Sequence, residues 1–290
     1  AFDHRIKNLD WMSAETKQRA LAKLHAFTKK IGFPDKWKTY DGLVIKRDDF
    51  IGNIWRCNQW NYQDNINRVG KPIDKSEWGM TPPTVNAYYR ANLNEIVFPA
   101  GILRFPFFDF EADDAINYGG IGAVIGHEMT HGFDDTGRQF DADGNLNDWW
   151  TKADAAEFKK RADAVVAQYN GYTVLDTLHV NGRLTLGENI ADLGGLSIAY
   201  EAFKSTKQGK SDKKIDGFTP DQRFFLNWAQ IWRNNILPDA AAQRILTDTH
   251  SPGVYRANGP LTNIDAFYKA FDLKEGDKMY KAPDQRIRIW

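Results

Sequence analysis

Apolar positions recur at helical spacing through most of the chain. After Ser13, the run AETKQRALAKLHAFTKK places Leu21, Leu24 and Phe27 on one face, so we predict a helix over 14–30. The same pattern predicts further helices, in chain order, from Asp48 or Asp49 to before Gly70, from Asp113 through the run ending HEMTHGF, and at 152–169, 187–204, 220–235, 239–248 and 263–271.

One segment has the pattern of strands. In VNAYYRANLNEIVFPAG (85–101), apolar and aromatic residues flank a polar turn at 92–94, which predicts two short strands of a hairpin. No repeat and no clear domain linker interrupts the helical pattern. The expected fold class is therefore mainly α with a small β-sheet (α+β).

Composition and charge narrow the possible partners. Lys plus Arg and Asp plus Glu number 38 each, giving a formal net charge of zero, so bulk charge favours neither nucleic acid nor an anionic membrane. No apolar run approaches the roughly 20 residues of a membrane span. With Cys57 as its single cysteine, the chain can form neither an internal disulfide nor a four-cysteine zinc site.

The stretch GAVIGHEMTHGFDD contains the first candidate metal ligands. His127 and His131 lie four positions apart, so on a helix both imidazoles project from one face and can bind one ion. Glu128, turned by about 100° from His127, can flank that ion without ligating it. The metzincin class would need a histidine where Gly137 stands, and is excluded.

A second stretch, LGENIADLGG, offers the missing carboxylate. Glu188 and Asp192 share one helical face, so one acid can bind the metal while the other accepts a hydrogen bond from a ligand histidine. We expect Glu188 to complete a His₂Glu zinc site, and Asp192 to support a ligand histidine, most plausibly His127. Asp134 is a second candidate for such support.

The acidic stretch DADGNLNDWW (141–150) has some features of a calcium loop. Gly144 comes too early for the EF-hand spacing, so we predict a turn there.

Five ordered motifs, VNAYY, GHEMTHGFDD, GENIADLGG, DTHSPGVYRANGP and RIRIW, resemble the neprilysin and endothelin-converting-enzyme family of zinc peptidases. The resemblance runs along nearly the whole chain. It implies a thermolysin-like zincin (gluzincin) catalytic domain that holds one Zn²⁺ ion. It also implies that His127, His131 and Glu188 are the zinc ligands and that Glu128 is the catalytic base.

The resemblance assigns further residues to the substrate. His250 would stabilise the oxyanion with Asp248 orienting it, Arg256 would bind a substrate carbonyl, and Asn86 and Ala87 would bind the peptide backbone on an edge strand. The family's apolar pocket for the residue after the scissile bond corresponds to Ile102, Phe107, Ala123, Val124, Ile231 and Trp232. Because mammalian relatives carry a bulkier residue at Ala123, we expect a roomier pocket here.

The resemblance also sets the expected context. Residues 1–290 resemble the C-terminal catalytic portion of a longer protein, in which the helical region 1–80 packs with an N-terminal lobe. The single cysteine suggests a bacterial member, because vertebrate relatives carry several disulfides. The family favours the cell envelope or an extracytoplasmic compartment, with the cytoplasm left open.

The expected function is zinc-dependent endopeptidase cleavage of short peptides, with a hydrophobic residue after the scissile bond. An endopeptidase is favoured because no local motif supplies the acidic group with which an aminopeptidase holds a free amine. A second hypothesis is a catalytically weak peptide-binding fragment of such an enzyme. A third, in which zinc only pins two helices, would leave Glu128 and His250 without a role.

Overall fold

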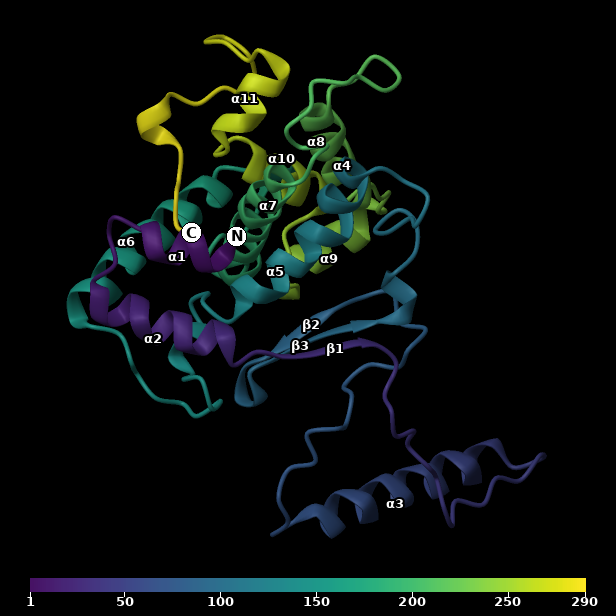
Figure 1. Ribbon diagram of the computed structural model, residues 1–290. Helices are drawn as coiled ribbons and strands as arrows, with labels where there is room; N and C mark the ends of the chain where they lie inside the picture. Colours follow the sequence, from purple (N-terminus) through teal and green to yellow (C-terminus); the bar gives the residue numbers. More distant parts are fainter.

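The computed structural model describes all 290 residues and confirms a mainly α-helical fold with small sheets (Figure 1). The helices are α1 Phe2–Asn8, α2 Ala14–His25, α3 Phe50–Arg68, α4 Asp114–Asn117, α5 Ala123–His131, α6 Lys152–Asn170, α7 Leu186–Ser205, α8 Pro220–Ile231, α9 Pro238–Thr247, α10 Gly253–Leu261 and α11 Asp265–Phe271. The strands are β1 Thr28–Gly32, β2 Tyr88–Arg90, β3 Glu95–Pro99, β4 Thr173–Leu175 and β5 Leu178–His179. No helix combines the length and the apolar character that a membrane crossing requires.

Two helices, α5 and α7, pack tightly at the centre of the molecule. A Cβ atom on Gly126 of α5 would lie 2.5 Å from the carbonyl oxygen of Gly195 on α7, and one on Gly195 would lie 2.4 Å from the backbone nitrogen of His127. Larger residues would therefore push the helices apart. The glycines explain how α5 and α7, which carry the candidate ligands, approach so closely.

The helix predicted from Asp113 is confirmed as helical backbone from Asp114 to His131, but it is not regular α-helix throughout. A π-helical turn, Tyr118–Gly122, separates α4 from α5. The amide of Ile121 donates 2.6 Å to the carbonyl of Phe107, outside the helix. A Cβ on Gly119 would lie 2.1 Å from the carbonyl oxygen of Phe224, and one on Gly120 would lie 2.3 Å from that of Phe107. Close packing of these glycines thus replaces regular helix here.

A three-stranded sheet of order β1-β3-β2 lies beside α5. The predicted hairpin is confirmed, since β2 and β3 are antiparallel, with β3 fully buried and β2 at an edge. The prediction that helix continues to Lys30 is wrong: α2 ends at His25, and β1 pairs in parallel with β3. Lys30 lies 2.7 Å from the buried carboxylate of Glu95, so long-range pairing overrides the local helical pattern.

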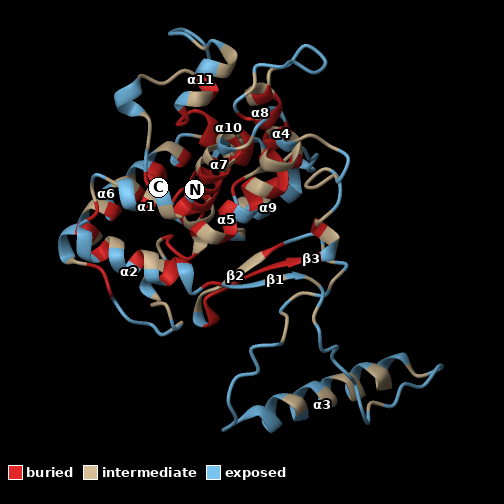
Figure 2. Cartoon of the chain, viewed as in Figure 1, coloured by how far each residue is buried: buried red, intermediate tan, exposed pale blue.

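Helix α3 forms an arm that projects away from the body of the molecule (Figure 1). Asp49 caps it, as expected, by accepting a hydrogen bond from the amide of Gly52. Its residues are exposed or intermediate along the whole length (Figure 2), so its apolar side chains join no core. Trp55 is 66% exposed.

The later helices agree with the prediction except in two places. Helix α8 begins at a capping box formed by Thr219 and Gln222 but ends at Ile231, four residues before the expected end. Helix α10 was not predicted, because its glycines and the internal Pro260 weaken the helical signal. The short β4–β5 hairpin was also missed.

The chain ends meet inside the core. Trp290 is 4% exposed, and its ring lies edge-on to those of Phe2 and Phe133, with centroids 5.9 and 5.7 Å away. The terminal motif RIRIW therefore joins α1 to the region directly after α5.

The predicted turn at 141–150 is confirmed. Asp141 Oδ1 accepts hydrogen bonds of 3.0 Å from the amides of Asp143 and Asn145, and Gly144 has a φ of +85°. Asp141 thus acts as the acceptor of a backbone turn.

Candidate metal centre and peptide cleft

Three candidate ligand side chains converge where α5 meets α7. The Nε2 atoms of His127 and His131 lie 3.0 Å apart. Glu188 places Oε2 3.3 Å from His127 Nε2 and Oε1 3.5 Å from His131 Nε2. The sequence spacing of four residues on α5 and the close α5–α7 packing together produce this convergence.

The other nitrogen of each histidine faces its own carboxylate. His127 Nδ1 lies 2.8 Å from Asp192 Oδ1, and His131 Nδ1 lies 2.6 Å from Asp134 Oδ2. These acids favour the tautomer that carries the proton on Nδ1, which leaves both Nε2 lone pairs directed at the same point. Asp134 is itself fixed, because its Oδ1 accepts from the backbone amide of Gly137 at 2.6 Å.

This donor set fits a tetrahedral metal ion. Donors about 2.0–2.1 Å from zinc in tetrahedral geometry are separated from one another by about 3.3 Å. The observed separations of 3.0, 3.3 and 3.5 Å among His127, His131 and Glu188 bracket this value. Two imidazoles and one carboxylate are also the ligand set of catalytic zinc sites that keep one position open.

Carboxylates dominate the electrostatics of the centre. Burial lowers the pKa of His127, but hydrogen bonds and charge from Asp192 and Glu188 outweigh this effect and raise the pKa to about 10. Burial raises the pKa of Glu188, whereas the hydrogen bond from His127 and the positive charges around it hold that pKa well below its usual value. The site therefore keeps ionised carboxylates that attract positive charge.

Glu128 lies beside the ligands on α5. A carboxylate oxygen of Glu128 and ligand nitrogens of His127 and His131 all lie within 4.8 Å of one another. Glu128 is 5% exposed, and burial raises its pKa. Glu188 contacts both histidines at 3.3 and 3.5 Å, and Glu128 lines the cleft beside them.

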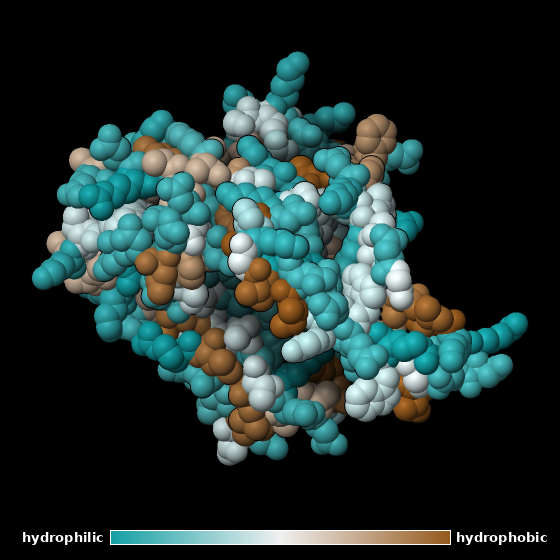
Figure 3. Space-filling view, turned by 90° about the horizontal axis from the view of Figure 1, so that it is seen from below, coloured by the Kyte–Doolittle hydropathy of each residue, from teal (hydrophilic) through white to brown (hydrophobic).

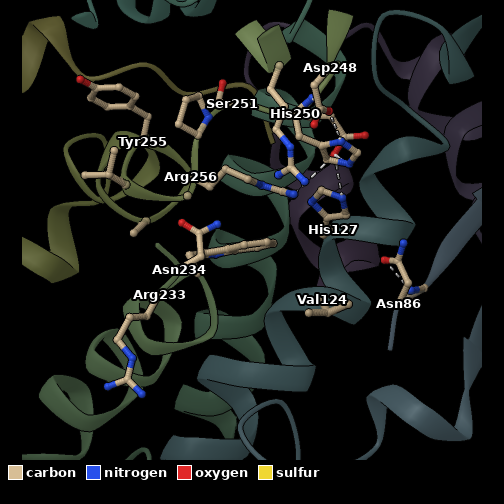
Figure 4. Close-up of a pocket in the computed structure, with 18 of the residues that line it drawn as sticks. Asn86, Val124, His127, Arg233, Asn234, Asp248, His250, Ser251, Tyr255 and Arg256 are labelled. Atoms are coloured by element: carbon tan, nitrogen blue, oxygen red, sulfur yellow. Dashed lines mark hydrogen bonds and ion pairs between the residues drawn. The ribbon is translucent and has the colours of Figure 1, made fainter. Parts of the chain in front are cut away.

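The opposite side of the centre is formed by the loop and helix around His250 (Figure 4). Asp248 Oδ1 lies 2.9 Å from His250 Nδ1 and also accepts from its backbone amide at 2.9 Å. His250 Nε2 lies 3.3 Å from Glu188 Oε2. The structure thus brings His250 to the metal ligands, with Asp248 holding its ring.

Arg256, on α10, is held by two carboxylates and one ring. Its Nε and one terminal nitrogen donate 2.8 Å bonds to Asp192, and the same terminal nitrogen lies 3.5 Å from Glu188 Oε2. The guanidinium carbon lies 3.8 Å from the ring centroid of Trp232. This stacking fixes Arg256 at the cleft wall.

A cleft of about 1640 Å³ contains these groups. Asn86 and Ala87, which directly precede the edge strand β2, line it, as do Val174 and Leu175 of the unpredicted β4. Four of the six expected pocket residues also line it: Ile102, Phe107, Val124 and Trp232.

The other two expected pocket residues do not line the cleft. Ala123 is fully buried and Ile231 is 9% exposed, and neither contributes to the wall. Ala123 lies on the side of α5 that packs on α7, where its carbonyl oxygen would lie 2.8 Å from a Cβ on Gly195. The expectation that Ala123 widens the pocket is therefore not supported.

Comparison with known proteins agrees with this geometry. Residues 86–287 match peptidase family M13, and residues 1–34 match the N-terminal part described for the same family. The chain belongs to peptidase family M13. This confirms the resemblance to the neprilysin and endothelin-converting-enzyme family.

Curated relatives of this M13 chain include an endothelin-converting enzyme homolog of Locusta migratoria, 44% identical over 300 residues, and human neprilysin, 41% identical over 302 residues. Each alignment covers the whole chain but only 41% and 40% of those relatives. The chain thus spans less than half the length of the curated relatives it matches.

Solved structures of longer proteins also match this chain along its whole length. The zinc metalloprotease Zmp1 of Mycobacterium tuberculosis, in complex with an inhibitor, superposes with a TM-score of 0.97 at 51% identity. PepO from Lactobacillus rhamnosis superposes with a TM-score of 0.92 at 34% identity. Each superposition includes the whole of this chain but only 45% of the longer protein.

Sequence reasoning missed contacts between residues that are distant in the chain. Trp232 was expected to line the apolar pocket, and it also stacks on Arg256. Lys23, with no sequence signal of function, donates to three carbonyls in the loop that follows His131. Neither contact has a spacing signature, because the partners belong to different elements.

Proposed function

We propose that this chain carries the catalytic site of a zinc-dependent endopeptidase that hydrolyses short peptides and holds one zinc ion. The observation that carries the proposal is the convergence of three ligand atoms, from His127, His131 and Glu188, beside Glu128 in an open cleft. When bound, zinc would acidify an attacking water and polarise the scissile carbonyl.

The protein's own residues supply the remaining chemistry. Glu128 accepts the proton of the attacking water and passes it to the departing amine. His250, held by Asp248, donates to the oxygen that becomes negative during the attack. Asp192 and Asp134 hold the two imidazoles in orientation.

Substrate binding uses the two walls of the cleft. The unpaired edge of β2, with Asn86 and Ala87 before it, can add an extended peptide by main-chain hydrogen bonds. Arg256 donates to a carbonyl beyond the scissile bond. Ile102, Phe107 and Val124 favour a hydrophobic side chain directly after that bond. Peptides with Leu or Phe there should have kcat/KM about tenfold or more above the Ala peptide, and equal rates would contradict this preference.

A chelator experiment tests the activity itself. The zinc-loaded protein is assayed on an internally quenched fluorescent peptide before and after removal of zinc, and again after zinc is restored. Cleavage that stops on chelation and returns with zinc supports the proposal. Peptide binding without cleavage at any zinc level supports the second hypothesis, a peptide-binding fragment of low activity.

We also propose that the arm 33–85 packs against a further lobe of a longer protein. The arm exposes many apolar side chains: Phe33, Trp37, Tyr40, Val44, Ile45, Phe50, Ile51, Ile54, Trp55, Tyr62, Ile66, Val69, Ile73 and Val85. Apolar residues stand among hydrophilic ones on the face seen from below (Figure 3). Exposed apolar side chains in this number usually mark a surface that binds another domain or protein.

Hydrogen exchange tests the arm. Amides of α3 should exchange at least tenfold more slowly in a longer form that includes such a lobe than in the chain 1–290 alone. Equal exchange in both forms would contradict the packing.

A further inference from the structure

The residues that follow Glu188 and His250 in the chain are joined by a buried hydrogen bond. Ser251 Oγ donates to Asn189 Oδ1 at 2.7 Å. The amide nitrogen of Asn189 donates in turn to Thr185 Oγ1 at 2.9 Å, which fixes the orientation of the amide and leaves its oxygen for Ser251. Asn189 is fully buried, and Thr185 and Ser251 are each 4% exposed.

This bond closes a ring of contacts around the catalytic groups. Glu188 and Asn189 are neighbours on α7, Ser251 and His250 are neighbours on the facing loop, and His250 Nε2 lies 3.3 Å from Glu188 Oε2. Asp248 fixes the His250 ring to its own loop. Ser251 fixes that loop to the helix that carries Glu188.

The Ser251–Asn189 bond also fixes the position at which α10 begins. Pro252, directly after Ser251, is the N-cap residue of this helix, which carries Arg256. At the next position a Cβ on Gly253 would lie 2.5 Å from the carbonyl oxygen of Trp232, so the start of the helix has no free space. The positions of His250 and Arg256, the two groups that would face the substrate, therefore both depend on where Ser251 is held.

We propose that Ser251 and Asn189 are positioning residues that set the place of His250 relative to Glu188, and so the geometry of oxyanion stabilisation. This inference rests on the proposed peptidase function. Buried polar groups keep their hydrogen-bond partners because an unpaired hydroxyl or amide away from water is costly. The Ser251–Asn189 bond therefore holds the loop that carries His250 in a fixed position on α7. A displacement of about 1 Å in a reacting group can lower a rate by about 100-fold.

The test begins with Ser251→Ala, which removes the donor and a single oxygen atom. Its matched control is Ser197→Ala, since Ser197 lies on α7, as Asn189 does, but bonds only locally, to the carbonyl of Leu193 at 2.8 Å. In the zinc-loaded protein we expect Ser251→Ala to lower kcat by about 10- to 100-fold with KM within about threefold. Zinc content should match that of the control, whereas the thermal midpoint should fall by a few degrees because the buried Asn189 Oδ1 loses its donor. A kcat within twofold of the wild-type value would overturn the proposal.

A double-mutant cycle separates positioning from a general structural role. If Ser251 acts through His250, then Ser251→Ala should lower kcat by less than about twofold in a His250→Ala background. A loss of the same factor in both backgrounds would overturn the proposal. Ser251→Thr keeps the hydroxyl and should restore kcat to within about fivefold of the wild-type rate if it folds.

A measurement without catalysis keeps the inference distinct from the proposed function. NMR signals of the His250 ring should be sharp in the wild-type protein and in Ser197→Ala, and broadened or shifted in Ser251→Ala. Unchanged His250 signals in Ser251→Ala would overturn the positioning role even in an active enzyme. A wild-type protein that cleaves no peptide, but whose His250 signals respond as expected, would count against the peptidase function alone.

Discussion

Replacing Lys23 with Met removes the ammonium group that ties α2 to the loop after α5. Lys23 is 1% exposed, and its Nζ donates to the carbonyl oxygens of Gly132, Gly137 and Phe140 at 2.6, 2.7 and 2.7 Å. Met has a similar length and no donor, so Lys23→Met leaves the carbonyl of Gly132 without its partner, whereas those of Gly137 and Phe140 still accept from the amide of Phe140 at 3.0 Å and from Trp149 Nε1 at 2.9 Å.

The magnitude follows from these three bonds. A buried acceptor that loses its only partner costs about 1–3 kcal/mol, and each of the other two hydrogen bonds contributes about 0.5–1.5 kcal/mol, so the gross loss is about 2–6 kcal/mol. Burial lowers the pKa of Lys23, which shows that desolvation of the ammonium offsets part of this stabilisation. We expect a net loss of about 3 kcal/mol in the free energy of unfolding.

The assay compares urea unfolding of zinc-free Lys23→Met with that of Lys17→Met. Lys17 also lies on α2, but its Nζ is exposed and donates to a single carbonyl. Lys17→Met should change the free energy of unfolding by less than about 0.5 kcal/mol. In Lys23→Met, hydrogen exchange should also speed up at the amide of Gly137, which holds Asp134. A loss below about 1 kcal/mol would refute the reasoning.

Three further changes test the centre and its frame. Gly126→Ala should lower zinc affinity and reduce the free energy of unfolding by about 1–3 kcal/mol, because α5 and α7 must separate. Its control, Gly122→Ala, should fold normally, because the nearest atom to the added Cβ lies 3.4 Å away. Hydrogen bonds from α2 and α6 outweigh burial and lower the pKa of Asp154 to about 2, so its stabilisation of about 2 kcal/mol is present above pH 4 and lost toward pH 2. The difference in urea stability between wild type and Asp154→Asn should shrink over that pH window; a constant difference would contradict this. Glu188→Ala should lower the measured zinc content well below one ion per chain.

The candidate metal ligands could be picked out from sequence because helical spacing places His127 beside His131 and Glu188 beside Asp192. His127 and His131 are four residues apart on α5. Glu188 lies on α7, in the motif LGENIADLGG, where Asp192 follows it by four residues. The predicted β2–β3 hairpin was similarly local. Spacing along one element is information that a single sequence carries.

Contacts between distant elements could not be predicted in this way. β1 forms because 28–32 pairs in parallel with a strand more than sixty residues later, and the local pattern is that of a helix. The Ser251–Asn189 bond and the Lys23 contacts likewise join side chains 62 and 109 or more residues apart. These contacts depend on how whole helices pack, which no local periodicity encodes.

The central claim, zinc-dependent hydrolysis with Glu128 as the base, is tested most directly by one comparison. Zinc content and kcat on a quenched fluorescent peptide are measured on the same samples of wild type and Glu128→Gln. The account predicts that Glu128→Gln keeps one zinc ion per chain and loses at least about 100-fold in kcat. A zinc-replete Glu128→Gln protein with the wild-type kcat would contradict it.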